Sequence, residues 1–134
     1  MGVDRTDTRQ VRNSEDVVAV RQMVREWSVA AGLGLVDQTK IVTAASELAR
    51  NLLDYGGGGT MTIEALSTGA RRGVRLVFED QGPGIADVEQ ALRDGFTSGL
   101  GLGLGLGGAK RLSNEFHIDS RPGEGTRITI ARWK

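Results

Sequence analysis

The chain has 134 residues, of which 39% are hydrophobic and 25% are charged, and this composition favours one globular domain spanning residues 1–134. Seventeen basic and seventeen acidic side chains cancel, so the charge gives no support to binding of nucleic acid or of an anionic membrane surface. The absence of cysteine and the single histidine exclude a disulfide framework and the usual zinc sites. A bound metal would therefore be one that prefers oxygen ligands, such as Mg²⁺.

The N-terminal stretch MGVDRTDTRQ is charged, and no run approaches the roughly 18 apolar residues of a membrane helix. We therefore expect a cytoplasmic protein.

Glycine occurs 20 times, about twice its usual share of roughly 7%. The glycines gather at residues 56–59, 82–84 and 99–108, which indicates specific positions in a site rather than a flexible filler.

Two amphipathic helices are expected first. Residues 14–31 repeat apolar side chains at alternating steps of three and four, which places them on one helical stripe. Ser14 is the expected N-cap and Gly32 the expected stop. Residues 37–55 repeat the same pattern, and the run Gly56 to Gly59 ends this second helix.

After the second helix the apolar period changes to two, which is typical of strands with one buried face. Two such runs joined by a short turn predict a hairpin. Helices gathered between hairpins predict an α+β sandwich, with helices covering one face of a mainly antiparallel sheet. The expected elements are strands 60–66 and 73–80, short helices 86–95 and 108–115, strands 116–120 and 126–133, and a short edge strand at 9–12.

The stretch ASELARNLLDY carries a carboxylate and an amide one helical turn apart. Glu47 and Asn51 leave the same face of the second helix, at the rim of its apolar stripe. One interpretation is a solvated polar edge. The other is a functional pair, in which Glu47 accepts a proton or orients a nucleophile and the amide oxygen of Asn51 ligates Mg²⁺.

The stretch DQGPG places Asp80 at the end of an expected strand, directly before a tight turn. Its carboxylate would suit an exocyclic amine, and Gly82 and Gly84 would let a flat ring approach the backbone. The alternative is a plain connection in which Asp80 caps its own turn.

The glycine tract GFTSGLGLGLGLGGAKRL, residues 95–112, fits neither common phosphate-binding motif. A Rossmann fingerprint needs a strand directly before it, where a helix is expected here, and the Walker spelling GxxxxGK[ST] does not occur. The glycines allow backbone amides to converge on an anion ahead of a helix that begins near Gly108. The alternative is a surface loop without a chemical role, but the interspersed leucines favour a lid over a ligand.

The stretch GEGTRITI sets Thr126 at the start of the last strand, after a glycine turn. One interpretation is an ordinary hairpin with a β-branched residue in a favourable place. The other gives the hydroxyl of Thr126 to a ligand, or to Asp80 through a water molecule.

In order and spacing, these four motifs resemble those of the Bergerat-fold ATPases of the GHKL superfamily. Glu47 and Asn51 match the asparagine box, DQGPG the first glycine box, GLGLGLG the second, and GEGT the final threonine box. The stretches SELARN, EDQGPGI and GLGLGGAKRL and the terminal WK also resemble stressosome switch kinases of the RsbT type. The resemblance spans essentially the whole chain and implies a Bergerat-fold two-layer sandwich with ATP between helices and sheet.

Site residues follow from this resemblance position by position. Glu47 is implied as the catalytic base, Asn51 as the ligand of Mg²⁺ on the phosphates, and Asp80 as the acceptor of the adenine amine. Thr126 is implied to support Asp80. The resemblance implies that the adenine side consists of Gly82, Gly84 and Ile85. It implies that the lid consists of Gly101, Leu102, Gly103, Leu104 and Gly105.

The same resemblance implies a protein serine/threonine kinase that uses ATP and Mg²⁺. Its expected substrates are STAS-domain scaffold and antagonist proteins, and its expected downstream effector is a metal-dependent serine phosphatase. Nucleic acid and membranes are not expected as partners. An anti-sigma factor, or another binding protein that switches partners with ATP, is the alternative, because the same fold serves both functions.

Overall fold

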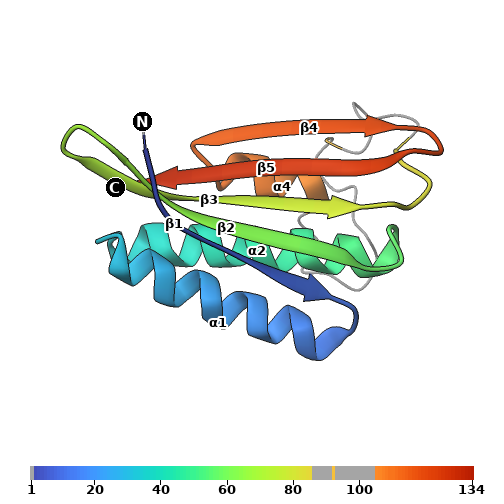
Figure 1. Ribbon diagram of the computed structural model, residues 1–134, viewed down its shortest axis with the longest axis horizontal. Coiled ribbons are helices and arrows are strands. Elements are labelled where there is room, and N and C mark those ends of the chain that lie inside the picture. Colours follow the sequence, from blue (N-terminus) through green and yellow to red (C-terminus); the bar gives the residue numbers. More distant parts are fainter. Residues whose placement is uncertain (1, 86–91, 93–104) are drawn as a thin grey trace.

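A computed structural model describes residues 2–85, 92 and 105–134 of the chain. It has two layers, an antiparallel five-stranded sheet and a layer of helices against one of its faces (Figure 1). The α+β prediction is thereby confirmed. The elements are β1 (Gly2–Val11), α1 (Ser14–Ala30), α2 (Leu35–Asp54), β2 (Gly59–Thr68), β3 (Arg71–Asp80), α4 (Gly105–Arg111), β4 (Glu115–Arg121) and β5 (Gly125–Trp133).

The strand order in the sheet is β1-β2-β3-β5-β4, and every neighbouring pair is antiparallel. β3 is central, and its last residue, Asp80, is paired in register with Thr126 of β5. Thr126 is in turn paired with Ser120 of β4. The pairing therefore sets three polar side chains in a row across the end of the sheet.

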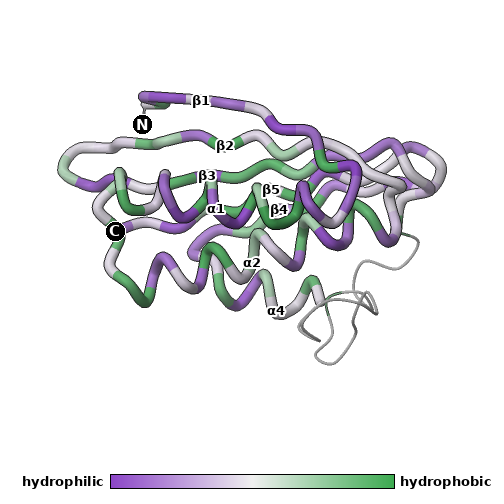
Figure 2. The backbone as a smooth tube through the Cα atoms, turned by 90° about the horizontal axis from the view of Figure 1, so that it is seen from below, coloured by the Kyte–Doolittle hydropathy of each residue, from purple (hydrophilic) through white to green (hydrophobic). Residues whose placement is uncertain are grey.

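The core lies between the helices and the sheet. Alternate residues of the central strands point into it, as the two-residue period predicts. The middle of β3 is hydrophobic, whereas β1 is mostly hydrophilic (Figure 2). No helix in the described part of the chain combines the length and the apolar character that a membrane crossing requires. The strand residues of this core include Met61, Ile63, Val74, Leu76, Phe78, Ile128 and Ile130, and the helices contribute Val20, Val24, Trp27, Ile41, Ala44, Ala45 and Leu48.

One end of the molecule gathers the segments that carry the sequence motifs. The C-terminal end of α2, the end of β3 and the turn between β4 and β5 lie at this end, whereas both chain termini lie at the other (Figure 1). Motifs that are far apart in the sequence are thus neighbours in the fold.

β1 is longer than the sequence predicts. Instead of a short strand at 9–12, residues Gly2–Val11 form a ten-residue edge strand paired with β2. Nine of its ten residues are exposed and only Val11 is buried. The strand lacks the apolar alternation by which a half-buried strand is recognised, because it lies at the edge of the sheet and is held by the hydrogen-bond ladder.

The N-cap of α1 is Asn13 and not Ser14. The side-chain Oδ1 of Asn13 accepts a hydrogen bond from the backbone N of Asp16 at 3.0 Å, which satisfies one of the free amides of the first turn. The hydroxyl of Ser14 instead accepts a hydrogen bond from Nη1 of Arg50 in α2 at 3.2 Å. The first helix otherwise has the predicted extent, and α2 begins two residues before the predicted start at Asp37.

The helix expected at 108–115 begins earlier. α4 spans Gly105–Arg111, and it starts inside the glycine tract because Leu106 and Ala109 are buried against the core. Burial of these two side chains offsets the low helix propensity of the glycines. The helix expected at 86–95 lies outside the described residues, apart from position 92.

Asp16 provides a prediction about pH. The backbone N of Arg12 donates a hydrogen bond to Asp16 Oδ2 at 2.8 Å and holds the pKa of this carboxyl below its ordinary value of 3.8. A carboxyl with a lowered folded-state pKa stabilises the protein above its unfolded pKa, and that contribution is lost as the pH falls through the folded pKa. We expect Asp16→Asn to lower the free energy of unfolding at pH 7 and to differ less from the parent at pH 3. Urea denaturation at both values measures this, and an equal difference at both would contradict it.

Candidate functional site

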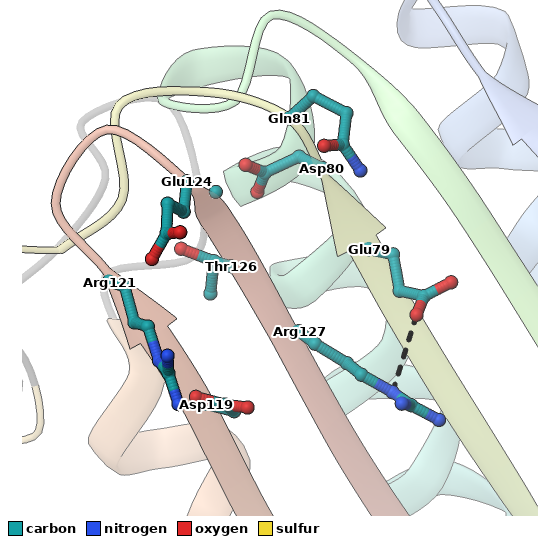
Figure 3. Close-up of a pocket in the computed structure, with 9 residues that line it drawn as sticks. Glu79, Asp80, Gln81, Asp119, Arg121, Glu124, Thr126 and Arg127 are labelled. Atoms are coloured by element: carbon teal, nitrogen blue, oxygen red, sulfur yellow. Dashed lines mark ion pairs between the residues drawn. The ribbon is translucent and has the colours of Figure 1, made fainter.

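The aspartate of the DQGPG stretch closes the turn that follows β3. Its Oδ1 accepts a hydrogen bond from the backbone N of Gly82 at 2.9 Å, and Gly84 has a φ of 77°, in the left-handed region. Asp80 therefore does cap its own turn, as the simpler interpretation expects. Capping of the turn uses only Oδ1 of Asp80. The side chain lies at the end of the sheet, close to the other residues labelled in Figure 3.

The C-terminal end of α2 is pressed against this turn through two glycines. A Cβ added to Gly56 would lie 2.6 Å from both Cβ and Cγ of Asp80, and a Cβ added to Gly82 would lie 2.8 Å from Cα of Gly56. Side chains do not tolerate such distances. The two glycines thus bring the helix that carries Glu47 and Asn51 into contact with Asp80.

Glu47 is deeply buried. Its relative exposure is 1%, and it is one of two buried polar or charged residues in the described part of the chain, the other being Ser28. A solvated polar edge is therefore wrong for Glu47, and so is the expected place at the rim of the core. The backbone N of Gly105 donates a hydrogen bond to Glu47 Oε1 at 3.1 Å. Gly105, the first residue of α4, thus contacts the carboxylate of Glu47, the predicted catalytic base.

Asn51 lies one turn further along α2 and has an unusual side-chain oxygen. Its Oδ1 is buried and has no hydrogen-bond partner in the described structure. A buried acceptor without a partner costs roughly 1–3 kcal/mol, so an oxygen in this state is suited to a ligand. Among the described residues no cluster of three or more His, Asp or Glu side chains could hold a metal ion. A cation here would take one ligand from Asn51 and the others from a phosphate and from water, as Mg²⁺ commonly does.

The turn between β4 and β5 supports the DQGPG turn from its other side. The backbone N of Gly123 donates to the carbonyl of Pro83 at 2.7 Å, and the backbone N of Ile85 donates to Oγ of Ser120, also at 2.7 Å. Ser120 Oγ is in turn 2.7 Å from Oγ1 of Thr126. Ser120 belongs to none of the four sequence motifs, and its only signal is its position opposite Thr126 in the strand register.

A small charged pocket of about 160 Å³ opens beside Asp80 and Thr126 (Figure 3). Charged side chains of β3, β4 and β5 form most of its wall, and an ion pair joins Arg127 Nε to Glu79 Oε1 at 3.3 Å. None of the residues that line it comes from α2. Its lining residues are Glu79, Asp80, Gln81, Asp119, Arg121, Glu124, Gly125, Thr126 and Arg127.

Most of the predicted site residues are thus gathered at one end of the two layers. The sheet and its turns contribute one group, α2 a second, and the start of α4 a third. The predicted lid residues Gly101, Leu102, Gly103 and Leu104 lie outside the described residues. The gathered residues are Glu47, Asn51, Asp80, Gly82, Gly84, Ile85, Gly105 and Thr126.

Comparisons with known proteins identify the family of the chain. Residues 36–134 match the family described as histidine kinase-, DNA gyrase B-, and HSP90-like ATPases. The serine/threonine-protein kinase RsbT of Bacillus subtilis (strain 168) is 47% identical over 118 residues, which are 88% of this chain and 89% of that protein.

Two further similarities are more distant. The anti-sigma F factor of Thermoanaerobacter sp. (strain X514) is 30% identical over 128 residues, covering 90% of this chain and 87% of that protein. A crystal structure of the RsbU and RsbW domains of a Mycobacterium tuberculosis protein superposes with a TM-score of 0.66 at 22% identity. It covers 96% of this chain, and this chain spans only 32% of that one. The structural similarity therefore supports the fold.

The contact between Gly56 and Asp80 provides a test of the site. We expect Gly56→Ala to push the Asp80 side chain aside and to weaken ATP binding roughly tenfold, equivalent to about 1.4 kcal/mol. The matched control is Gly34→Ala, at the other end of α2, where an added Cβ meets nothing within 4 Å and φ is −70°. Isothermal titration calorimetry gives both affinities, and a Gly56→Ala variant that binds ATP as tightly as the parent would contradict the proposed position of the adenine site.

Proposed function

Since the chain belongs to the histidine kinase-, DNA gyrase B-, and HSP90-like ATPase family and is a serine/threonine-protein kinase of the RsbT type, we propose that Glu47 is its catalytic base. The observation that carries this proposal is the pairing of a buried carboxylate with a buried, unpartnered amide oxygen on one face of α2. Glu47 is 1% exposed, and Asn51 Oδ1 has no partner in the described structure. Burial of such a pair lowers the stability of the folded protein, which favours a functional reason for it.

ATP is the cofactor that the family implies, and its adenine end is assigned to the end of β3. The carboxylate of Asp80 accepts a hydrogen bond from the exocyclic amine of adenine. The absence of side chains at Gly82 and Gly84 lets Gly56 and the carbonyl of Arg121 close against the turn, so that this wall of the adenine site is fixed by backbone contacts. Ile85 is partly buried against the core and offers the ring an apolar contact. Thr126, paired in register with Asp80, completes this end of the site.

The phosphate end is assigned to α2. The free oxygen of Asn51 fits Mg²⁺, because this cation takes oxygen ligands and usually keeps few of them from the protein. When bound, Mg²⁺ neutralises charge on the phosphates as the phosphoryl group leaves.

Glu47 acts on the substrate hydroxyl. As the serine or threonine oxygen forms its bond to the γ-phosphorus and the bond to the β–γ bridging oxygen breaks, the hydroxyl proton passes to the carboxylate of Glu47. The amide of Gly105 holds Oε1 of this carboxylate and so orients it. Most of the rate enhancement then comes from positioning and electrostatics.

We place the substrates among STAS-domain scaffold and antagonist proteins of the cytoplasm, and the downstream effector among metal-dependent serine phosphatases. The similarity to an RsbT kinase supports this assignment. An anti-sigma function is the second candidate and is favoured by the relative of that name, but its identity is 30% against 47% for the kinase.

Calorimetry on the parent and on Asp80→Asn tests the adenine assignment. In the variant an amide NH₂ group would face the adenine amine, so that two donors meet and a hydrogen bond to a charged acceptor is lost. We expect Mg·ATP affinity to fall roughly 10- to 100-fold. The matched control is Asp7→Asn, an exposed aspartate on the edge strand β1, which should bind ATP as the parent does. Absence of ATP binding by the parent protein would contradict the proposed function itself.

Phosphoryl transfer from γ-labelled ATP to a STAS-domain protein tests the catalytic base. Glu47→Gln keeps the size of the side chain and an oxygen that accepts from Gly105, but it removes the proton acceptor. We expect the rate of labelling to fall about 100-fold or more while ATP affinity stays within about threefold of the parent.

The control for this experiment is Glu64→Gln, a carboxylate on β2 that pairs with Arg75 at 2.6 Å and lies away from the site. It should label the substrate at the parent rate. Labelling by Glu47→Gln at the parent rate would show that another group takes the proton.

A further inference from the structure

The turn that carries Asp80, Gly82 and Gly84 is held by the neighbouring hairpin as well as by its own hydrogen bond from Gly82 to Asp80. Its carbonyl at Pro83 and its amide at Ile85 are both bonded to the β4–β5 hairpin. A Cβ added to Gly84 would overlap the carbonyl of Arg121, so backbone meets backbone at this point. Ser120 is the one side chain among these supports, and it contacts the turn and Thr126 at the same time.

The hydroxyl of Ser120 has three polar neighbours and one hydrogen to give. It accepts from the backbone N of Ile85 at 2.7 Å, because an amide can only donate. Its own hydrogen can go to Thr126 Oγ1 at 2.7 Å or to the carbonyl of Gly125 at 3.3 Å. The choice decides whether Thr126 keeps its hydrogen for the nucleotide site.

The two directions have different consequences. If Ser120 donates to Gly125, Thr126 must donate to Ser120 and has nothing left for the site. If Ser120 donates to Thr126, the hydroxyl of Thr126 remains a donor. Its neighbour across the strand pairing is Asp80, a carboxylate that only accepts, and hydrogen bonds to a charged acceptor are the stronger ones. In the second direction Ser120 donates across its contact of 2.7 Å with Thr126, and in the first it donates across the longer contact of 3.3 Å with Gly125.

We propose that Ser120 is a positioning residue for the nucleotide. It relays a hydrogen-bond direction from the amide of Ile85 through its own hydroxyl to Thr126, so that Thr126 donates toward Asp80 and the adenine end of the site. Ser120 itself touches neither ATP nor the substrate. This inference rests on the proposed function, and it assigns to that site a residue outside the four motifs.

A relay of this kind predicts a specific kinetic pattern. Ser120 acts on the adenine end, whereas Glu47 and Asn51 lie on α2. Loss of the serine hydroxyl should therefore raise the Kd of ADP and of ATP by the same factor and raise the KM for ATP. It should leave kcat at saturating ATP unchanged within about twofold, because the lost interaction stabilises the bound nucleotide and the transition state equally.

The experiment is a double-mutant cycle on the full chain, with the Kd of ADP measured by calorimetry. We expect Ser120→Ala to raise the Kd about fivefold, and Ser120→Thr, which keeps a hydroxyl, to restore parent affinity. Thr126→Val should also weaken binding. The double variant should bind no more weakly than Thr126→Val alone, because without the threonine hydroxyl Ser120 has nothing to direct.

The possible results separate the relay from other roles. Additive effects of the two substitutions would mean that Ser120 only supports the turn through Ile85, and would overturn the relay. Parent affinity in Ser120→Ala, with a parent protein that binds ADP, would overturn this inference and leave the proposed function standing. A parent protein that binds neither ADP nor ATP would overturn both.

The matched control is Ser67→Ala. Ser67 is also partly buried on a strand, and its hydroxyl donates to Asp4 Oδ1 at 3.2 Å at the far end of the sheet. Its substitution should leave the Kd of ADP unchanged. Equal melting temperatures of the Ser67→Ala and Ser120→Ala variants would show that a loss of affinity in the second does not arise from unfolding.

Discussion

The close approach of backbone segments around the end of β3 is the constraint on which the rest of the site depends. A side chain at Gly59 would overlap the carbonyl of Glu79, and one at Gly125 would overlap the carbonyl of Asp80. A third segment, at Gly56, lies against the carboxyl group of Asp80. The starts of β2 and β5 and the end of α2 therefore converge at distances that only glycine permits. Asp80 is positioned by main chain on several sides, which is a form of preorganisation that no flexible side chain could supply.

One face of α2 both packs in the apolar core and carries the carboxylate of Glu47. Ala44, Ala45 and Leu48 of α2 belong to the apolar core, and Glu47 lies among them at 1% exposure. A carboxylate in such surroundings is tolerated only when hydrogen bonds compensate for the lost water. The amide of Gly105 contributes one of these bonds. Stability and chemistry are consequently coupled where α4 begins, because the same contact serves both.

The parts of the fold that follow periodic burial are predictable from the sequence, and the other parts are not. α1, α2 and the β2–β3 hairpin each have one buried face, and their apolar periods reveal them. β1 has almost no buried residue, so its pattern contains no such signal. Ser120 escapes prediction for another reason, since its importance arises from the register of β4 against β5. The burial of Glu47 depends on how α4 packs on α2, which local spacing does not reveal.

The charged edge of β1 has a consequence for the way this molecule meets others. In the part of the chain that the structure describes, β1 pairs only with β2, and its other side is a free edge of the sheet. Such an edge invites a further strand, and native proteins oppose this with charges and irregular pairing. Asp4, Arg5, Asp7 and Arg9 line β1, and its register shifts between Val3 and Arg5. A foreign strand would have to desolvate these ions, so the chain is protected from open-ended polymerisation at this edge.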